Sequence, residues 1–220
     1  MNTGTIKRLL CSSLAMMLAA AGMVFAQETD KQKQDEVIRI ANQVRKKILM
    51  ISTYGPFDYI TFGIAPGAQG YTVLLKGYAS RPTLKDSAER EVKRIENVGT
   101  VENQIEVLPT SNMDEDIRLR AYTKIYNYPT LARYNPNYGT PIYGSARSFA
   151  NTMQMGISTN PPMGFHPISI IVKGGHIILE GVVDNESDKT AAGMQANQVS
   201  GVFSVTNNLY VTQPEKKKEK

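Results

Sequence analysis

The two histidines are the side chains of this protein best suited to metal or acid–base chemistry. His166 and His176 are its only histidines, and they flank a segment whose alternating apolar residues predict a strand. A protein zinc site needs three or four ligands, and neither Asp nor Glu lies between the two histidines. We therefore expect both to be surface or hairpin-end side chains, and we expect no metal site.

A carboxylate site is the next candidate, because Asp184, Glu186 and Asp188 follow shortly after His176. These acids occupy a loop and the first turn of an expected helix, where negative side chains interact favourably with the helix dipole. Asn185 between them is a residue type preferred at the N-cap. The pattern therefore indicates a helix start.

Nucleophilic catalysis has no candidate residue in this sequence. No Ser–His–Asp order with a nucleophile elbow is present. The single cysteine, Cys11, cannot form an intramolecular disulfide and lies in a segment expected to be removed. We predict a protein that is not an enzyme, with no catalytic residue and no cofactor.

The first 26 residues are predicted to be a cleaved signal peptide. Lys7 and Arg8 precede a mostly apolar stretch that ends in small residues around Ala26, and a polar run begins at Gln27. The alternative is an uncleaved anchor; a lipoprotein is disfavoured because Cys11 lacks a lipobox. Cleavage lowers the net charge from +5 to +3, since the two cations leave with the peptide. We expect a periplasmic protein, with secretion as the alternative.

Gly77 and Gly181 each end an apolar stretch that precedes an expected helix. Backbone amides at such a position bind phosphate in some proteins, but no glycine-rich run or P-loop lysine follows. A backbone conformation that only glycine tolerates, or a close helix–sheet approach, is the favoured explanation. Asn103 and Asn207 are likewise expected to be structural, bonding loop backbone at the start of a strand.

The two glycines belong to an internal duplication. Residues 73–77 are echoed by residues 177–181, and apolar positions agree at the same offset of 104 up to Val107 and Val211. Upstream, Phe57 corresponds to Phe165, with an offset longer by four residues. The chain therefore contains one structural unit twice.

Each copy is predicted to have the element order α-β-β-α-β. In the first copy, residues 35–50 and 84–96 show helical apolar spacing, whereas residues 59–64, 72–79 and 101–108 alternate as strands do. The last β-α-β step should be a right-handed crossover, so its two strands are parallel or share one mixed sheet. We expect an α+β fold in which each copy packs two helices on a three-stranded mixed sheet.

The signature residues of the copies resemble those of the BON domain, a periplasmic, phospholipid-binding domain family. They are the strand glycine, a Gly-Val pair after the helix and a later asparagine: Gly77, Asn103, Gly181, Gly201, Val202 and Asn207. The first copy has Asn97 in place of the glycine of the pair, and asparagine is the next-best residue for the left-handed conformation after a helix. The copies would span residues 35–109 and 113–211.

This resemblance implies a tandem, non-enzymatic envelope protein associated with phospholipid surfaces and with envelope integrity under osmotic stress. The expected partner is anionic phospholipid or an envelope surface, with an envelope protein as the alternative; nucleic acid is disfavoured by export. The family consensus has no place for the Pro- and Tyr-rich insert at 128–164, which we expect to be a partly ordered loop. Residues 212–220 are expected to form a charged, disordered tail.

Two surfaces are candidates for binding. The helix over 186–200 carries Lys189 and then no further charge, and Gly193 in its middle costs about 1 kcal/mol relative to Ala. Something is therefore expected to approach Gly193, Met194 and Asn197 closely, which is either the rest of the protein, a partner or a membrane.

Cations on the first helix form the second surface, in particular Arg45 and Lys46. Such residues interact favourably with an anionic leaflet, and the alternative is an ordinary solvated helix face.

Overall fold

The computed structural model of the protein describes residues 31–136 and 164–212. The chain divides into two compact units, residues 1–44 and 45–220. In the first unit residues 31–44 are helical, and the helix continues to residue 49 in the second. The predicted signal peptide, most of the predicted insert and the predicted tail (all but residue 212) lie outside the described residues.

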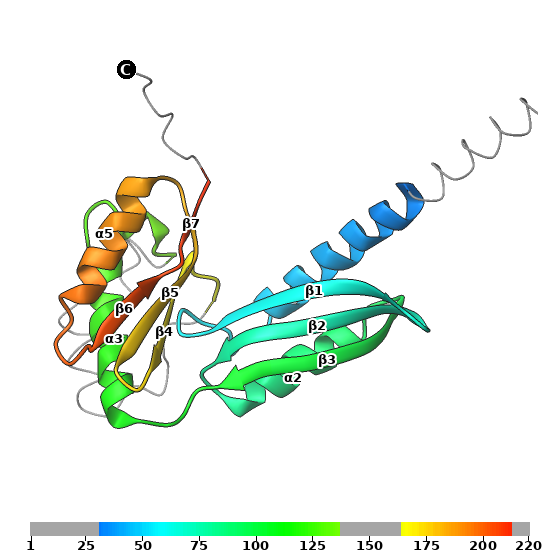
Figure 1. Ribbon diagram of the computed structural model, residues 1–220, viewed down its shortest axis with the longest axis horizontal. Helices are drawn as coiled ribbons and strands as arrows, with labels where there is room; N and C mark the ends of the chain where they lie inside the picture. Colours follow the sequence, from blue (N-terminus) through cyan, green and yellow to red (C-terminus); the bar gives the residue numbers. More distant parts are fainter. Residues whose placement is uncertain (1–30, 137–163, 213–220) are drawn as a thin grey trace, which may run out of the picture. The chain divides into compact units, whose positions relative to one another are not determined.

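The first copy builds a three-stranded mixed sheet in the order β1-β2-β3 (Figure 1). Strands β1 (Tyr59–Gly67) and β2 (Gly70–Ala79) are antiparallel, whereas β2 and β3 (Val98–Val107) are parallel. The crossover between the parallel strands contains α2 (Pro82–Lys93), which buries Leu84, Ala88 and Val92. Pro82 stands at the first helical turn, where its missing N–H leaves no hydrogen bond unmade.

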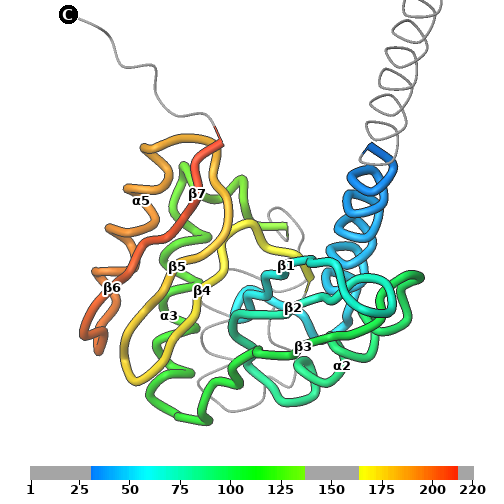
Figure 2. Tube along the Cα trace, turned by 45° about the vertical axis from the view of Figure 1, so that its right-hand side comes forward, coloured from blue at the N-terminus to red at the C-terminus, as the bar shows by residue number. Residues whose placement is uncertain are grey.

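The second copy repeats this plan. Its elements are α3 (Asn112–Tyr126), the short 3-10 helix η1 (Ala132–Tyr134), β4 (Ile168–Lys173), β5 (His176–Val183), α5 (Glu186–Asn197), β6 (Ser204–Asn207) and β7 (Tyr210–Val211). Strands β4 and β5 are antiparallel, and both β6 and β7 run parallel to β5. Helices α3 and α5 lie together on one side of this sheet (Figure 1, Figure 2).

The predicted α+β class and the two mixed sheets are therefore confirmed, with one difference in the second copy. Its last strand is divided into β6 and β7, which makes the sheet four-stranded within the described residues. At the break, the N–H of Leu209 donates to the side-chain oxygen of Asn207, 3.3 Å away.

The two signature asparagines join the last strand to the preceding helix. The side-chain amide of Asn103 donates to the carbonyl of Lys85 at 3.1 Å, and that of Asn207 donates to the carbonyl of Lys189 at 2.7 Å. The two asparagines are 104 residues apart in the sequence, and so are the two lysines whose carbonyls they bond. The asparagines are thus structural as expected. Asn207 bonds loop backbone at Leu209 as predicted, and both asparagines also bond a helix carbonyl, which the sequence did not suggest.

The signature glycines lie inside strands β2 and β5, and not at the strand ends as the sequence suggested. Gly77 and Gly181 have φ of +119° and +121°, a region that favours glycine. A Cβ on Gly77 would overlap the carbonyl oxygen of Tyr59, and one on Gly181 that of Pro167. The close approach is therefore between neighbouring strands.

The residues that follow the two crossover helices adopt the left-handed conformation. Gly201 has φ of +89° and Asn97 has φ of +66°, and Asn97 is the only described non-glycine residue with a positive φ. This confirms that asparagine replaces glycine in the first copy without a change of backbone conformation.

A Cβ at position 181 should destabilise the fold, because alanine there meets both an unfavourable φ and the carbonyl oxygen of Pro167. We expect Gly181→Ala to lower the free energy of unfolding in urea by at least about 2 kcal/mol. Gly63→Ala is the matched control, since nothing lies within 4 Å of a Cβ built on that strand residue. Equal urea midpoints for the two variants would contradict this explanation.

Candidate binding site

A pocket of about 600 Å³ lies within the unit of residues 45–220. Strand β1 of the first copy forms one side of it, and strands β4, β5 and β7 of the second copy contribute residues to the other. Its lining is mainly aromatic and aliphatic, and Arg45 is the one lining residue of the described chain with a full charge. We call this pocket the aromatic groove.

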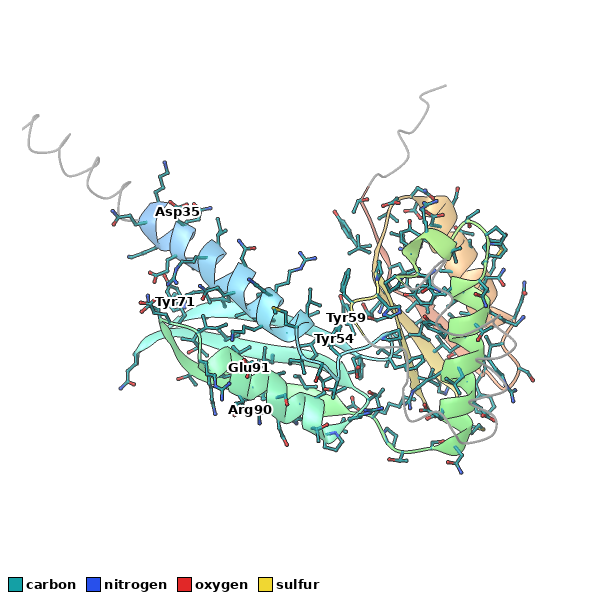
Figure 3. The ribbon with its side chains drawn as sticks, turned by 180° about the vertical axis from the view of Figure 1, so that it is seen from behind. Asp35, Tyr54, Tyr59, Tyr71, Arg90 and Glu91 are labelled. Carbon is teal, nitrogen blue, oxygen red and sulfur yellow. The ribbon has the colours of Figure 1, made fainter. Side chains whose placement is uncertain are left out.

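The first copy supplies tyrosines and aliphatic side chains to the aromatic groove. Tyr54 and Tyr59 lie close together next to the start of β1 (Figure 3), and Leu49 comes from the last turn of the first helix. Burial raises the pKa of Tyr54 well above its usual value. Burial also raises the pKa of Tyr59, with a smaller contribution from the negative charge of Glu180. Both tyrosines are therefore neutral at ordinary pH.

The second copy supplies apolar side chains that face solvent. Phe165 is 48% exposed, Tyr210 is 69% exposed and Val182 is 46% exposed, and all three line the groove. Large apolar side chains are seldom left in water together without a function. Their grouping makes the groove the strongest candidate for a binding site.

A tight turn positions Tyr54 ahead of β1. The buried carboxyl of Asp58 accepts the N–H of Gly55 at 2.9 Å and the N–H of Ser80 at 2.6 Å. Burial raises the pKa of Asp58, and the two donated hydrogen bonds act in the opposite direction. This residue fixes the turn against the end of β2.

Two backbone hydrogen bonds hold this turn to the second copy. The N–H of Gly164 donates to the carbonyl of Tyr54 at 2.9 Å, and the N–H of Ile170 in β4 donates to the carbonyl of Pro56 at 2.7 Å. Phe57, at the end of the turn, is buried in the hydrophobic core of the second copy. The two sides of the aromatic groove are thus joined at one end.

His166 is a buried residue and not the surface residue that the sequence suggested. It is 3% exposed, its Nδ1 lies 2.9 Å from the carbonyl oxygen of Gly164, and its ring packs edge-on against Tyr122 and Tyr126. Burial lowers its pKa. His176 is exposed at the start of β5, as expected.

The predicted basic surface is placed in part at the groove. Arg45 and Lys46 are both exposed, but only Arg45 lines the groove. The next residue, Lys47, is engaged elsewhere, because its Nζ lies 3.1 Å from a carboxylate oxygen of Glu91.

The residues of the predicted contact face on α5 differ in exposure. Gly193 is buried, and a Cβ there would lie 2.9 Å from the side-chain nitrogen of Asn207. The approach to Gly193 is therefore made by the protein itself. Lys189 is partly exposed, Met194 and Asn197 face solvent, and none of these residues lines the groove.

The acids at the start of α5 have a structural role. Asn185 caps the helix by accepting the N–H of Asp188, which confirms the predicted N-cap. The buried carboxylate of Asp188 also accepts hydrogen bonds from Arg133 and, at 2.7 Å, from the hydroxyl of Tyr134. This pairing could not be predicted from the sequence, because Arg133 and Tyr134 belong to the predicted loop.

Tyr54, Tyr59, Val182 and Tyr210 lie in no sequence motif, and the sequence did not predict them to be binding residues. The one available sequence signal was that Phe57 and Phe165 correspond in the duplication. The structure shows that the two differ in exposure, because Phe57 is buried and Phe165 is half-exposed. Among the described residues no cluster of three His, Cys, Asp or Glu side chains could hold a metal ion. Within the same ranges, no helix is both long and apolar enough to cross a membrane.

The buried imidazole predicts a loss of stability in acid. The folded pKa of His166 lies below its usual 6.5, so the unfolded chain binds more protons once the pH falls below about 6.5. We expect the free energy of unfolding to decrease between pH 7 and pH 5, and to decrease less in His166→Gln. Chemical denaturation across this range is the measurement, and His176→Gln is the exposed control. Equal pH slopes for the protein and His166→Gln would contradict the prediction.

Comparisons with known proteins identify the duplicated unit. A family model described as "BON domain" matches residues 68–109 and 157–213. Among solved structures, the C-terminal domain of CdsD, a structural protein of the type III secretion system of Chlamydia trachomatis, is 10% identical with a TM-score of 0.24, over 78% of this chain and 96% of its own. A second CdsD structure is 12% identical with a TM-score of 0.24, over 80% and 92%. No match was found among curated proteins.

Proposed function

Because this chain is a tandem BON domain protein, we propose that it is a non-enzymatic envelope protein that binds anionic phospholipid surfaces peripherally. In this proposal residues 1–26 direct export to the periplasm and are removed there. The two domains span residues 35–109 and 113–211. The physiological role would be support of envelope integrity under stress.

The observation that carries this proposal is the placement of cations beside exposed apolar side chains. Arg45 and Lys46 are exposed on the last turns of the first helix, and Arg45 lines the same groove as the exposed Phe165 and Tyr210. Cations attract an anionic leaflet, and aromatic side chains favour its interface. A modest net charge is sufficient because the cations are concentrated locally.

Removing these cations should weaken binding to anionic vesicles. Each Lys or Arg near an anionic leaflet contributes about 1 kcal/mol, so we expect the double variant Arg45→Gln, Lys46→Gln to bind phosphatidylglycerol vesicles roughly tenfold or more weakly in flotation assays. The effect should be largest at low salt, where charges are least screened.

The matched control removes two other cations from the same protein. Lys93 and Arg94, at the end of α2, form ion pairs with Glu89 and Glu91, so Lys93→Gln, Arg94→Gln should bind vesicles as the unchanged protein does. Absence of flotation with phosphatidylglycerol at low salt, or an equal loss in both double variants, would refute the proposal.

A protein-interaction role is the second candidate, and the exposed face of α5 favours it. Met194 is half-exposed on a helix that has no charged residue after Lys189. A photo-crosslinker at position 194 in living cells is expected to give one dominant protein adduct if the protein is a scaffold. A crosslinker at exposed Thr110, between the two copies, is the control. Lipid adducts, or a diffuse set of proteins at both positions, would exclude this role.

A further inference from the structure

Exposed apolar side chains are concentrated at one place on the described protein. Eight large apolar residues are substantially exposed, and three of them, Phe165, Val182 and Tyr210, line the aromatic groove. The remaining five include Met113, Met194 and Phe203, none of which lines it. The groove is therefore the place on the described surface where exposed apolar side chains are grouped.

The size of the groove limits what can enter it. Its volume of about 600 Å³ lies within the range of about 300–1,000 Å³ typical of small-molecule sites. A folded domain or a bilayer can cover such a site but cannot fill it. One flexible alkyl chain is small enough to enter it.

Backbone hydrogen bonds fix the two sides of the groove relative to each other. The bonds from Gly164 to Tyr54 and from Ile170 to Pro56 join its two sides. Gly181 in its lining lacks a side chain, and its backbone packs directly against Pro167. A preformed apolar site binds a ligand without the cost of ordering its own walls.

The charge of the groove selects the head of the ligand. Arg45 is the only fully charged residue of the lining, which contains no acid among the described residues. The complementary ligand has one anionic group for Arg45 and an apolar body for the remaining surface.

We infer that the aromatic groove binds a single-chain anionic amphiphile, with its alkyl chain among Tyr54, Phe165 and Tyr210 and its head at Arg45. A free fatty acid and a lysophospholipid are two sources of this chemistry. The choice of a lipid-like ligand rests on the proposed phospholipid function, but it concerns a single molecule in solution and not a bilayer surface. The protein would then take up lipid monomers as well as contact membranes.

The test is calorimetric titration of the purified protein below the critical micelle concentration. Dodecanoate and lauroyl-lysophosphatidylglycerol are the anionic probes, and dodecyltrimethylammonium has the same chain with a cationic head. We expect saturable binding of one anionic probe per protein and at least tenfold weaker binding of the cationic one. Each methylene removed from the fatty acid should weaken binding roughly fourfold. The better of the two anionic probes identifies the source of the ligand.

Two pairs of variants locate the site. Tyr210→Asp is matched by Phe203→Asp, because the two aromatic residues are 69% and 71% exposed and only Tyr210 lines the groove. Arg45→Gln is matched by Lys46→Gln, which removes the neighbouring cation outside the groove. We expect Tyr210→Asp and Arg45→Gln to weaken dodecanoate binding at least tenfold, and each control to change it less than twofold.

Several outcomes would overturn the inference. They are no binding of either anionic probe, equal binding of the cationic probe, and equal losses in a variant and its control. If monomers fail to bind while anionic vesicles do, the groove is a bilayer contact, and the proposed function stands without the inference. If sedimentation shows a dimer that Tyr210→Asp dissociates, a second copy of the chain occupies the groove. If lipid monomers bind and vesicles do not, the inference is supported and the proposed binding to phospholipid surfaces is refuted.

Discussion

The hydrogen bond from the N–H of Ile170 to the carbonyl of Pro56 joins the turn before β1 in the first copy to strand β4 of the second. It is made at the edge of β4, a strand that is buried along most of its length. Side chains of the second copy bond further polar groups of this edge. The hydroxyl of Tyr126 bonds both backbone groups of Ile168, and Arg118 donates to the carbonyl of Val172. An unpaired edge strand so apolar would be prone to association with other chains.

The same turn connects packing to the candidate site. Phe57 adds an aromatic ring to the core of the second copy, where it packs edge-on against Tyr122 with ring centroids 6.1 Å apart. Tyr54, three residues earlier, forms part of the aromatic groove. One short segment, fixed by the carboxyl of Asp58, therefore serves both stability and surface chemistry. Buried aromatic pairs of this kind add about 1 kcal/mol beyond their burial.

The two copies illustrate how a duplicated unit diverges. The asparagine that ties the last strand to the helix is retained, with the same partners at the same offset. In the first copy the amide of Asn103 has a second acceptor, the carboxylate of Glu89. In the second copy Gly193 occupies the position of that glutamate, and the two residues pack closely without a carboxylate. The second copy therefore keeps the hydrogen bond from the asparagine to the helix carbonyl and lacks the carboxylate of Glu89.

The sequence by itself determined the elements and their order, because these depend on local periodicity and on residues with special backbone requirements. Alternation predicted the strands, helical spacing predicted α2 and α5, and the duplication located the glycines and asparagines that the backbone needs. It also led to the BON domain family, since the signature residues are fold-making.

Only the tertiary structure decided which side chains meet. Whether Phe57 or Phe165 is buried depends on how residues more than 100 positions apart pack together, and both are equally apolar in the sequence. His166 was expected at the surface and is buried for the same reason, because α3 places Tyr122 and Tyr126 against it. Arg45 and Lys46 are neighbouring exposed cations, but only Arg45 lines the aromatic groove. Local pattern determines what each segment becomes, and long-range packing determines which surface is left to bind.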